Sequence, residues 1–263
     1  IESIGSETRA TASSSSSSSS SSAPAAPPVI IEPIGIRFVL LQEFIQTERR
    51  FASSMNLVSW KFSRPLLGLP PNPPKSLMAP TFVRAIFGPL EAISIVVDTF
   101  IDLVESRILE NGPQALVGDA FDELSTKIVT CIHYSDSYPQ AIAALTESMR
   151  KSPSLTRFIE RTEKSPHCDG KTLRTFLKMP LERIQGYAIF LSDFASATPE
   201  SHPDYQVIGT ALERVRSSSV HFQKHDSSDL ERLISVEQRL KGCKSLVSGT
   251  RRYIREMRLV LLQ

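Results

Sequence analysis

The sequence predicts an all-α protein, an elongated bundle of about six helices, on three observations. Apolar residues recur at spacings of three and four over long stretches from residue 34 onward, which is the period of an amphipathic helix. Glycine is sparse, with 11 in 263 residues, and prolines cluster where the helical periods stop. Between about residues 34 and 241 we find no convincing alternation of apolar and polar residues of the kind that strands show.

The helices are expected in the following order. A first helix runs from Ile34 to Phe62 and ends where a proline cluster begins at Pro65, because proline removes a hydrogen-bond donor. A second helix covers residues 87–107 and stops at Asn111-Gly112-Pro113. Residues 118–148 read as helical with an interruption at Pro139.

Three further helices complete the predicted bundle. A short helix covers residues 155–163, and the longest apolar period follows over residues 173–194, with a bend expected at Pro180. The last long helix opens at His202-Pro203-Asp204, where proline suits the first turn, and runs to Phe222.

Both ends of the chain differ from this helical part. Residues 1–33 contain ten consecutive serines and several prolines, with too little apolar surface to offset the entropy of ordering, so we expect a disordered linker. A phosphorylation or docking segment is the alternative. Residues 252–262 are compatible with a first β-strand. Because one strand is not a domain, and because the chain starts at Ile1, we expect a piece of a longer protein.

Composition narrows the class of protein. The chain is 41% hydrophobic and 22% charged, which is typical of a globular domain. Its 30 basic and 28 acidic residues are spread along the chain, which argues against electrostatic binding of nucleic acid. No apolar run approaches the roughly 20 residues of a membrane span. Three widely spaced cysteines without a metal-ligand pattern favour a reduced compartment, so we expect a cytoplasmic protein.

One carboxylate stands out in the first helix. Glu48 shares a face with five apolar residues, Phe44, Phe51, Met55, Val58 and Phe62. A lone charge is costly to bury without a partner. Two alternatives follow: Glu48 pairs inside the fold, for instance with an arginine on a neighbouring helix, or its carboxylate is presented outward to another molecule.

The residues around Glu48 help to distinguish an internal ion pair from an outward carboxylate. Residues 43–51, Glu-Phe-Ile-Gln-Thr-Glu-Arg-Arg-Phe, resemble the first conserved segment of the Dbl homology (DH) domain of Rho guanine nucleotide exchange factors (RhoGEF). Residues 177–187, Leu-Lys-Met-Pro-Leu-Glu-Arg-Ile-Gln-Gly-Tyr, resemble its third segment, usually Leu-Leu-x-Pro-x-Gln-Arg-x-x-Lys/Arg-Tyr. Residues 86–93 resemble the second segment, and residues 117–121 with Tyr134, Tyr138 and Pro139 the stretch that follows it.

The resemblance covers about residues 36–226 and implies a domain organisation. Residues 34–228 would form the DH domain. Residues 229–263 would be a linker helix and the first strand of a truncated pleckstrin homology (PH) domain, since Arg251-Arg252-Tyr253-Ile254-Arg255 is similar to the usual start of that domain. The missing remainder of this PH-like domain would be the only route to membrane phosphoinositides and to peripheral recruitment.

The function that the resemblance implies is guanine nucleotide exchange on a Rho-family small GTPase of Rho, Rac or Cdc42 type. Such a factor stabilises the nucleotide-free GTPase and makes or breaks no bond, so no catalytic residue, cofactor or metal is expected. Thr47 and Glu48 match family positions that contact the GTPase, and this match favours the outward alternative for Glu48.

The third segment departs from the family where the family contacts its partner. Lys178, Glu182 and Gly186 replace the usual leucine, glutamine and cation, at spacings that share one helix face. Gly186 also costs about 1 kcal/mol of helix propensity relative to alanine. Arg183 matches the family, and Gln223 takes the place of an asparagine in the last helix.

Two outcomes remain open on these residues. The chain is an exchange factor whose surface has drifted, with Lys178 and Glu182 forming a solvated pair, or an exchange-inactive DH-fold scaffold or protein-interaction module. Retention of Thr47, Glu48 and Arg183 favours the active factor. The expected GTPase-contacting residues are Glu48, Thr47, Lys178, Glu182, Arg183, Gly186 and Gln223.

Overall fold

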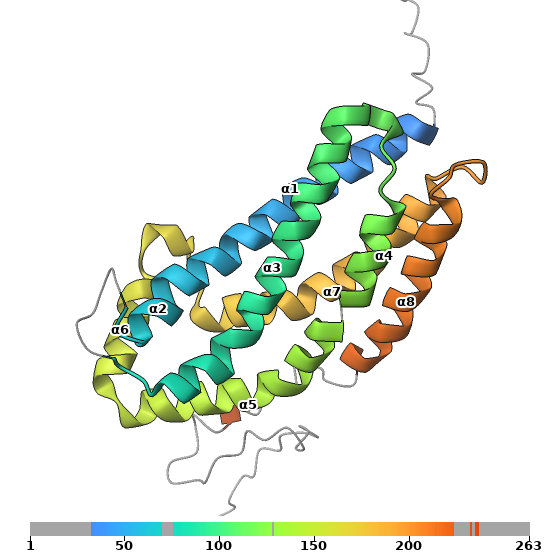
Figure 1. Ribbon diagram of the computed structural model, residues 1–263. Helices are drawn as coiled ribbons and strands as arrows, with labels where there is room; N and C mark the ends of the chain where they lie inside the picture. Colours follow the sequence, from blue (N-terminus) through green and yellow to red (C-terminus); the bar gives the residue numbers. More distant parts are fainter. Residues whose placement is uncertain (1–32, 70–75, 128, 224–231, 233–234, 237–263) are drawn as a thin grey trace, which may run out of the picture. The chain divides into compact units, whose positions relative to one another are not determined.

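The computed structural model describes residues 33–69, 76–127, 129–223, 232 and 235–236 (Figure 1). The chain divides into two units after Ile31, and every described residue belongs to the second unit. The expected linker over residues 1–33 lies outside the described residues except for Pro33, which begins α1, and the expected strand near the C-terminus lies outside them too, so both stay predictions.

All the regular elements of the described residues are helical, which confirms the all-α prediction. Two 3₁₀ turns lie over Gly112–Gln114 and Pro166–Cys168, and a π-helical turn joins α1 to α2 over Ser59–Ser63. The α-helices are α1 Pro33–Val58, α2 Arg64–Leu66, α3 Pro80–Asn111, α4 Gly118–Lys127, α5 Val129–Lys151, α6 Pro153–Glu163, α7 Leu173–Ser196 and α8 Tyr205–Gln223.

Local chemistry fixes several helix ends. α3 ends at Gly112, whose positive φ of 54° is a conformation that glycine adopts without a steric penalty. The Ser152 hydroxyl accepts a hydrogen bond from the Leu155 amide at 3.4 Å and caps the start of α6. The Thr172 hydroxyl accepts one from the Thr175 amide at 3.2 Å and caps α7. Such caps satisfy amide groups that the helix itself leaves without partners.

Proline positions gave the least accurate predictions. The expected interruption at Pro139 is wrong, because Pro139 lies inside α5 and is buried there, while the helix boundary falls between Lys127 and Val129. Pro65 sits in the first turn of α2, so the helical path of α1 continues past it to Leu66. A proline costs one backbone hydrogen bond within a helix, and packing of the apolar face can outweigh that loss.

An aromatic cluster joins four helices in the core. Phe44 of α1 stacks on Phe190 of α7 with ring centroids 3.8 Å apart. The same ring lies 5.7 Å from Phe121 of α4 and 6.1 Å from Phe100 of α3. Helix α1 therefore packs against both α3 and α7, and α8 packs along α4 and α7 (Figure 1).

A buried ion pair ties the start of α1 to two distant loops. Arg37 is 1% exposed, and its guanidinium donates to the Asp204 carboxylate at 2.5 Å and to the Ala115 carbonyl at 3.1 Å. The same carboxylate accepts a hydrogen bond from the Val117 amide at 2.8 Å. The guanidinium also lies 4.8 Å from the centre of the Phe194 ring. These contacts fix the register of α1 against the α3–α4 and α7–α8 connections.

We expect Asp204→Asn to destabilise the domain strongly, because it keeps the shape of the side chain and leaves the Arg37 charge buried without a counterion. The free energy of unfolding should fall by about 3–5 kcal/mol. Urea unfolding followed by circular dichroism measures this, with the exposed Asp193→Asn as the matched control. A loss below about 1 kcal/mol, the range of ordinary substitutions, would contradict the role given to this pair.

Candidate functional site

Glu48 is fully buried between α1 and α7. Its side chain is 0% exposed, and the Arg183 guanidinium of α7 covers it. The Arg183 Nε donates to Glu48 Oε1 at 2.6 Å, and an Arg183 Nη2 contact reinforces this bond. The Tyr187 hydroxyl donates to the second carboxylate oxygen at 3.0 Å. Both carboxylate oxygens therefore have partners inside the fold.

Arg183 connects this buried carboxylate to the surface. Its side chain is 19% exposed, and its Nη2 donates to the Thr47 hydroxyl at 2.8 Å. The guanidinium lies 5.0 Å from the centre of the Phe44 ring and 5.2 Å from that of Tyr187. A cation near two aromatic rings gains additional electrostatic attraction. Thr47 itself is exposed, so Arg183 and Thr47 form the outer layer above Glu48.

The outward presentation of the Glu48 carboxylate, favoured by the resemblance, is wrong for this structure, and the internal pair is the alternative that occurs. The physical reason lies in the helix periodicity. Glu48 shares its face with Phe44, Phe51 and Met55, which are all buried, so the face that carries the carboxylate points into the bundle. Whether Glu48 takes part in contacts with a GTPase stays a prediction.

Burial governs the protonation of this carboxyl. Loss of solvation raises the pKa of Glu48 above its ordinary value, while the Arg183 charge and the hydrogen bonds from Arg183 and Tyr187 act in the opposite direction. A pKa raised by burial means that the ionised form depends on Arg183 for its stabilisation. The pair is thus a single electrostatic unit with one exposed edge.

Lys178 lies about two turns before Gly186 on α7, and Glu182 lies about one turn before it. The Lys178 ammonium and the Glu182 carboxylate are 3.4 Å apart, and 59% of the Glu182 side chain is exposed. This is the solvated pair that the sequence allowed, and such pairs contribute a few tenths of a kcal/mol. A Cβ atom built on Gly186 would meet only the Arg183 Nη1 atom, at 3.6 Å. A side chain therefore fits at position 186 beside Arg183.

The structure thus brings together Thr47, Glu48 and Arg183 and places Lys178, Glu182 and Gly186 along the same helix as Arg183. Gln223 is the last residue of α8, and its side chain lies outside the described part.

Sequence reasoning missed two residues of this region. Tyr187 belongs to the segment that resembles the third family segment, but the sequence does not indicate its hydrogen bond to Glu48, although both residues occupy buried apolar faces. Ile189 of α7 is 66% exposed, three residues after Gly186. The signal for Ile189 was available, since it is a large apolar residue outside the buried period of α7.

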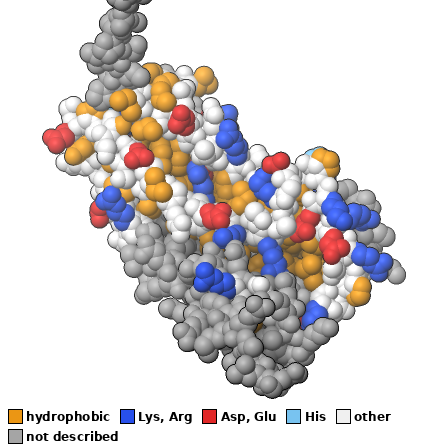
Figure 2. All heavy atoms as spheres, turned by 180° about the vertical axis from the view of Figure 1, so that it is seen from behind, with side chains coloured by type: hydrophobic (Ala, Val, Ile, Leu, Met, Phe, Trp, Pro, Cys, Tyr) orange, Lys and Arg blue, Asp and Glu red, His pale blue; other side chains and the backbone are white. Residues whose placement is uncertain are grey.

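Other kinds of site find no support in the described residues. Within residues 33–223 apart from the gaps, no three His, Cys, Asp or Glu side chains gather as a metal site would require. None of the helices in that part combines the length and apolarity of a membrane-crossing segment. On the face shown in Figure 2, acidic and basic side chains of the described residues are interspersed.

Known proteins share this sequence pattern and this fold. The family model of the RhoGEF domain matches residues 40–223. Guanine exchange factor for Rac 30 of Dictyostelium discoideum is 26% identical over 87% of this chain and 14% of its own length. FYVE, RhoGEF and PH domain-containing protein 1 of Homo sapiens is 23% identical over 86% of this chain and 24% of its own length. The chain therefore spans less than a quarter of these relatives.

Two solved structures show the same arrangement of helices. The linker-DH/PH domains of p115-RhoGEF superpose with a TM-score of 0.63 at 19% identity, over 78% of this chain and 61% of that chain. The DH/PH domains of PDZ-RhoGEF in complex with activated RhoA give a TM-score of 0.63 at 15% identity, over 80% of this chain and 59% of that chain. Because the family model matches well over half of the sequence, this chain belongs to the RhoGEF domain family.

Proposed function

We propose that this chain accelerates GDP release from a Rho-family small GTPase of Rho, Rac or Cdc42 type, which docks on the α1–α7 surface. The observation that carries the proposal is the Arg183–Glu48 pair. It joins the first and third family segments, 135 residues apart, beneath one surface. The names of relatives support the activity, and the PDZ-RhoGEF structure contains bound RhoA.

The activity requires binding and no covalent chemistry, so the chain would be a regulator and not a chemical catalyst. Small GTPases hold GDP through Mg²⁺ and phosphate contacts of their switch loops. A partner that binds the nucleotide-free arrangement more tightly lowers the affinity of the GTPase for its nucleotide. By linkage, bound nucleotide lowers the affinity of the GTPase for that partner by the same factor. The chain itself needs no cofactor or metal for this role.

Within this proposal Glu48 acts from beneath the docking surface. Because its carboxylate is fully buried, it cannot reach a partner while Arg183 stays in place. We therefore assign the direct contacts to residues that are at least partly exposed, Thr47, Lys178, Glu182, Arg183 and Gly186, and to Gln223, whose side chain lies outside the described part. Glu48 serves as a positioning residue that holds the Arg183 guanidinium toward the GTPase.

The second candidate function is an exchange-inactive helical interaction module. Two observations favour it: Lys178 and Glu182 pair with each other, and Gly186 supplies no cation. Whichever activity holds, the proposed setting is the cytoplasm, with residues 229–263 opening a PH-like domain that approaches membranes.

Nucleotide release should separate the two candidate functions. With a panel of Rho-type GTPases loaded with a fluorescent GDP analogue, the wild-type chain should accelerate release from at least one member above its spontaneous rate. Glu48→Gln should abolish most of this acceleration, because Arg183 loses its anchor. The exposed Glu43→Gln on the same helix is the control and should keep it. No acceleration on any GTPase would remove the exchange hypothesis.

Arg183→Gln tests how Glu48 acts. If Glu48 works through Arg183, this substitution should lower exchange as much as Glu48→Gln does, and the double variant should lose no more, since both remove one unit. Exchange that rises in Arg183→Gln would mean that Arg183 merely covers Glu48 and that the carboxylate is the direct contact. Arg157→Gln on α6 is the matched control, and Arg157 is exposed.

The same variant predicts a pH dependence of stability. Removing Arg183 leaves a buried carboxylate unpaired and raises the pKa of Glu48 further above 4.5. At pH 7 the free energy of unfolding should fall by about 3 kcal/mol, the low end of the range for broken buried pairs, because Arg183 is partly exposed. This loss should shrink as the pH falls through the raised pKa of Glu48 and should be smallest below pH 4.5, where the carboxyl is mostly protonated in the folded and in the unfolded protein. Urea unfolding at several pH values measures it, and a loss independent of pH would contradict the pairing.

Gly186→Lys tests whether the missing cation limits exchange. A side chain fits at this position, so both Gly186→Ala and Gly186→Lys should raise the free energy of unfolding by about 0.5–1 kcal/mol through helix propensity. Nucleotide release should be faster with Gly186→Lys than with Gly186→Ala, because only lysine supplies the missing cation. Equal or slower release with lysine would show that the cation is not the limiting defect.

A further inference from the structure

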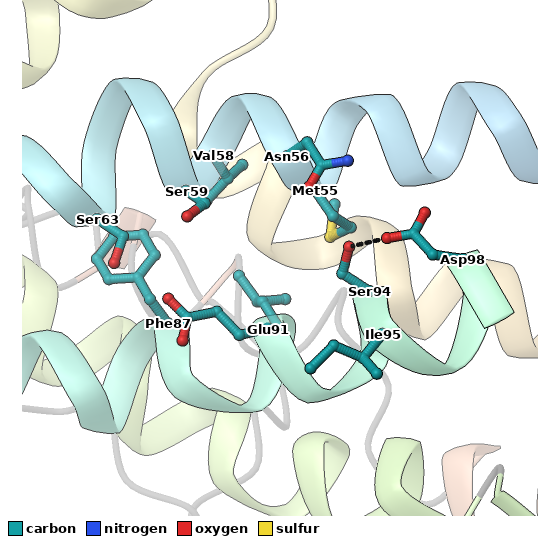
Figure 3. Close-up of a pocket in the computed structure, with 11 residues that line it drawn as sticks. Met55, Asn56, Val58, Ser59, Ser63, Phe87, Glu91, Ser94, Ile95 and Asp98 are labelled. Atoms are coloured by element: carbon teal, nitrogen blue, oxygen red, sulfur yellow. Dashed lines mark hydrogen bonds between the residues drawn. The ribbon is translucent and has the colours of Figure 1, made fainter.

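A cavity lies between α1 and α3, away from the Glu48–Arg183 pair. Its volume is about 200 Å³, and one wall is formed by the end of α1 with the π-helical turn while the other is α3 (Figure 3). Its lining residues are Met55, Asn56, Val58, Ser59, Ser63, Phe87, Leu90, Glu91, Ser94, Ile95 and Asp98. This volume suits one ring with a short chain, a ligand smaller than most drugs.

The inner part of the cavity is apolar. Met55, Val58, Phe87 and Leu90 are all buried, with exposures of 1–3%. Methionine adapts its shape readily and makes favourable contacts with aromatic rings. The apolar part of a ligand would therefore pack against side chains that include the adaptable Met55.

The π-helical turn contributes a hydroxyl group without a partner. Ser63 is 3% exposed, and no described residue forms a hydrogen bond with its hydroxyl. Ser54 shows the usual alternative, since its hydroxyl donates to the Arg50 carbonyl one turn earlier at 2.9 Å. Turns of π-helix occur frequently at functional sites because they redirect side chains. In Figure 3 the Ser59 and Ser63 side chains lie on the α1 side of the cavity and face α3.

The α3 wall supplies negative charge without a counterion. Glu91 and Asp98 lie two helical turns apart on one face of α3, and no described cation forms an ion pair with either. Among the described residues, the Asp98 side chain accepts a hydrogen bond only from the Ser94 hydroxyl, at 3.3 Å. Carboxylates beside an apolar cavity favour a cation and disfavour an anion. Glu91 is exposed and Asp98 is partly buried, so a neutral apolar ligand would shield the Asp98 carboxylate further from water without compensation.

We propose that this cavity binds a small organic cation that carries an apolar body, of the arylalkylamine class. The body packs on Met55, Phe87 and Leu90, and the ammonium group donates hydrogen bonds to the Glu91 carboxylate and the Ser63 hydroxyl. An ammonium group has three donors, so the geometry also allows a bond toward Ser59. The cavity and the α1–α7 contact both use α1, but the second wall of the cavity is α3, and the binding test below uses no GTPase, so its outcome does not depend on the proposed exchange activity.

The test measures binding of 2-phenylethylamine to the full chain without any GTPase. The ¹³C-labelled methyl group of Met55, assigned with Met55→Leu, should shift saturably with a dissociation constant on the order of millimolar. 2-Phenylethanol and 3-phenylpropionate have similar bodies without the positive charge, and both should bind at least about fivefold more weakly. Lysine should also bind more weakly, which separates a small aryl cation from a lysine side chain of a partner protein.

Two variants complete the test. Glu91→Gln combined with Asp98→Asn keeps the shape of the wall and should weaken binding of 2-phenylethylamine about three- to tenfold at low salt. Glu110→Gln, an exposed carboxylate at the far end of α3, is the control and should leave it unchanged. The proposal is overturned if no saturable shift occurs, if 2-phenylethanol binds equally well, if lysine binds more tightly, or if the double variant binds as wild type does.

Discussion

The ion pair between Glu48 and Arg183 is the interaction on which the structure of the candidate site depends. It places a fully buried carboxylate in the middle of the apolar face of α1, where an unpaired charge would be costly. The same guanidinium reaches Thr47 at the surface and lies near the Phe44 and Tyr187 rings. The Arg183 side chain therefore contributes both to the packing of α1 on α7 and to the polar surface that it forms with Thr47.

A second buried pair gives this surface its frame. Arg37 and Asp204 fix the beginning of α1 against the loops that lead into α4 and α8. The Phe44, Phe121 and Phe190 rings pack together between α1, α4 and α7. Because α1 is held both at Arg37 and at Glu48, the face between these two residues has little freedom to rotate. Such rigidity suits a surface that must stabilise one arrangement of a partner's loops over another.

Much of the fold could be predicted from the sequence, and the reasons are local. Local sequence determines the apolar periods of α1, α3 and α7 and the end of α3 at Gly112. These features could therefore be predicted from neighbouring residues alone. The helix boundary before Val129 and the burial of Pro139 depend on packing between distant helices and were not predictable in that way. For Glu48 the apolar period shared with Phe44, Phe51 and Met55 indicated the inward direction, which the family resemblance outweighed. Its partner Arg183 could not be identified, because it lies 135 residues away and pairing at that separation leaves no local signal.

The most direct test of this account is a structure of the chain bound to a nucleotide-free Rho-type GTPase. The account predicts that the GTPase lies on the α1–α7 surface, that Arg183 still donates to the buried Glu48 carboxylate, and that its guanidinium faces a switch loop. A complex in which Arg183 has swung away and Glu48 itself contacts the switch loop would contradict the positioning role. A GTPase seated on another face would contradict the proposed surface altogether.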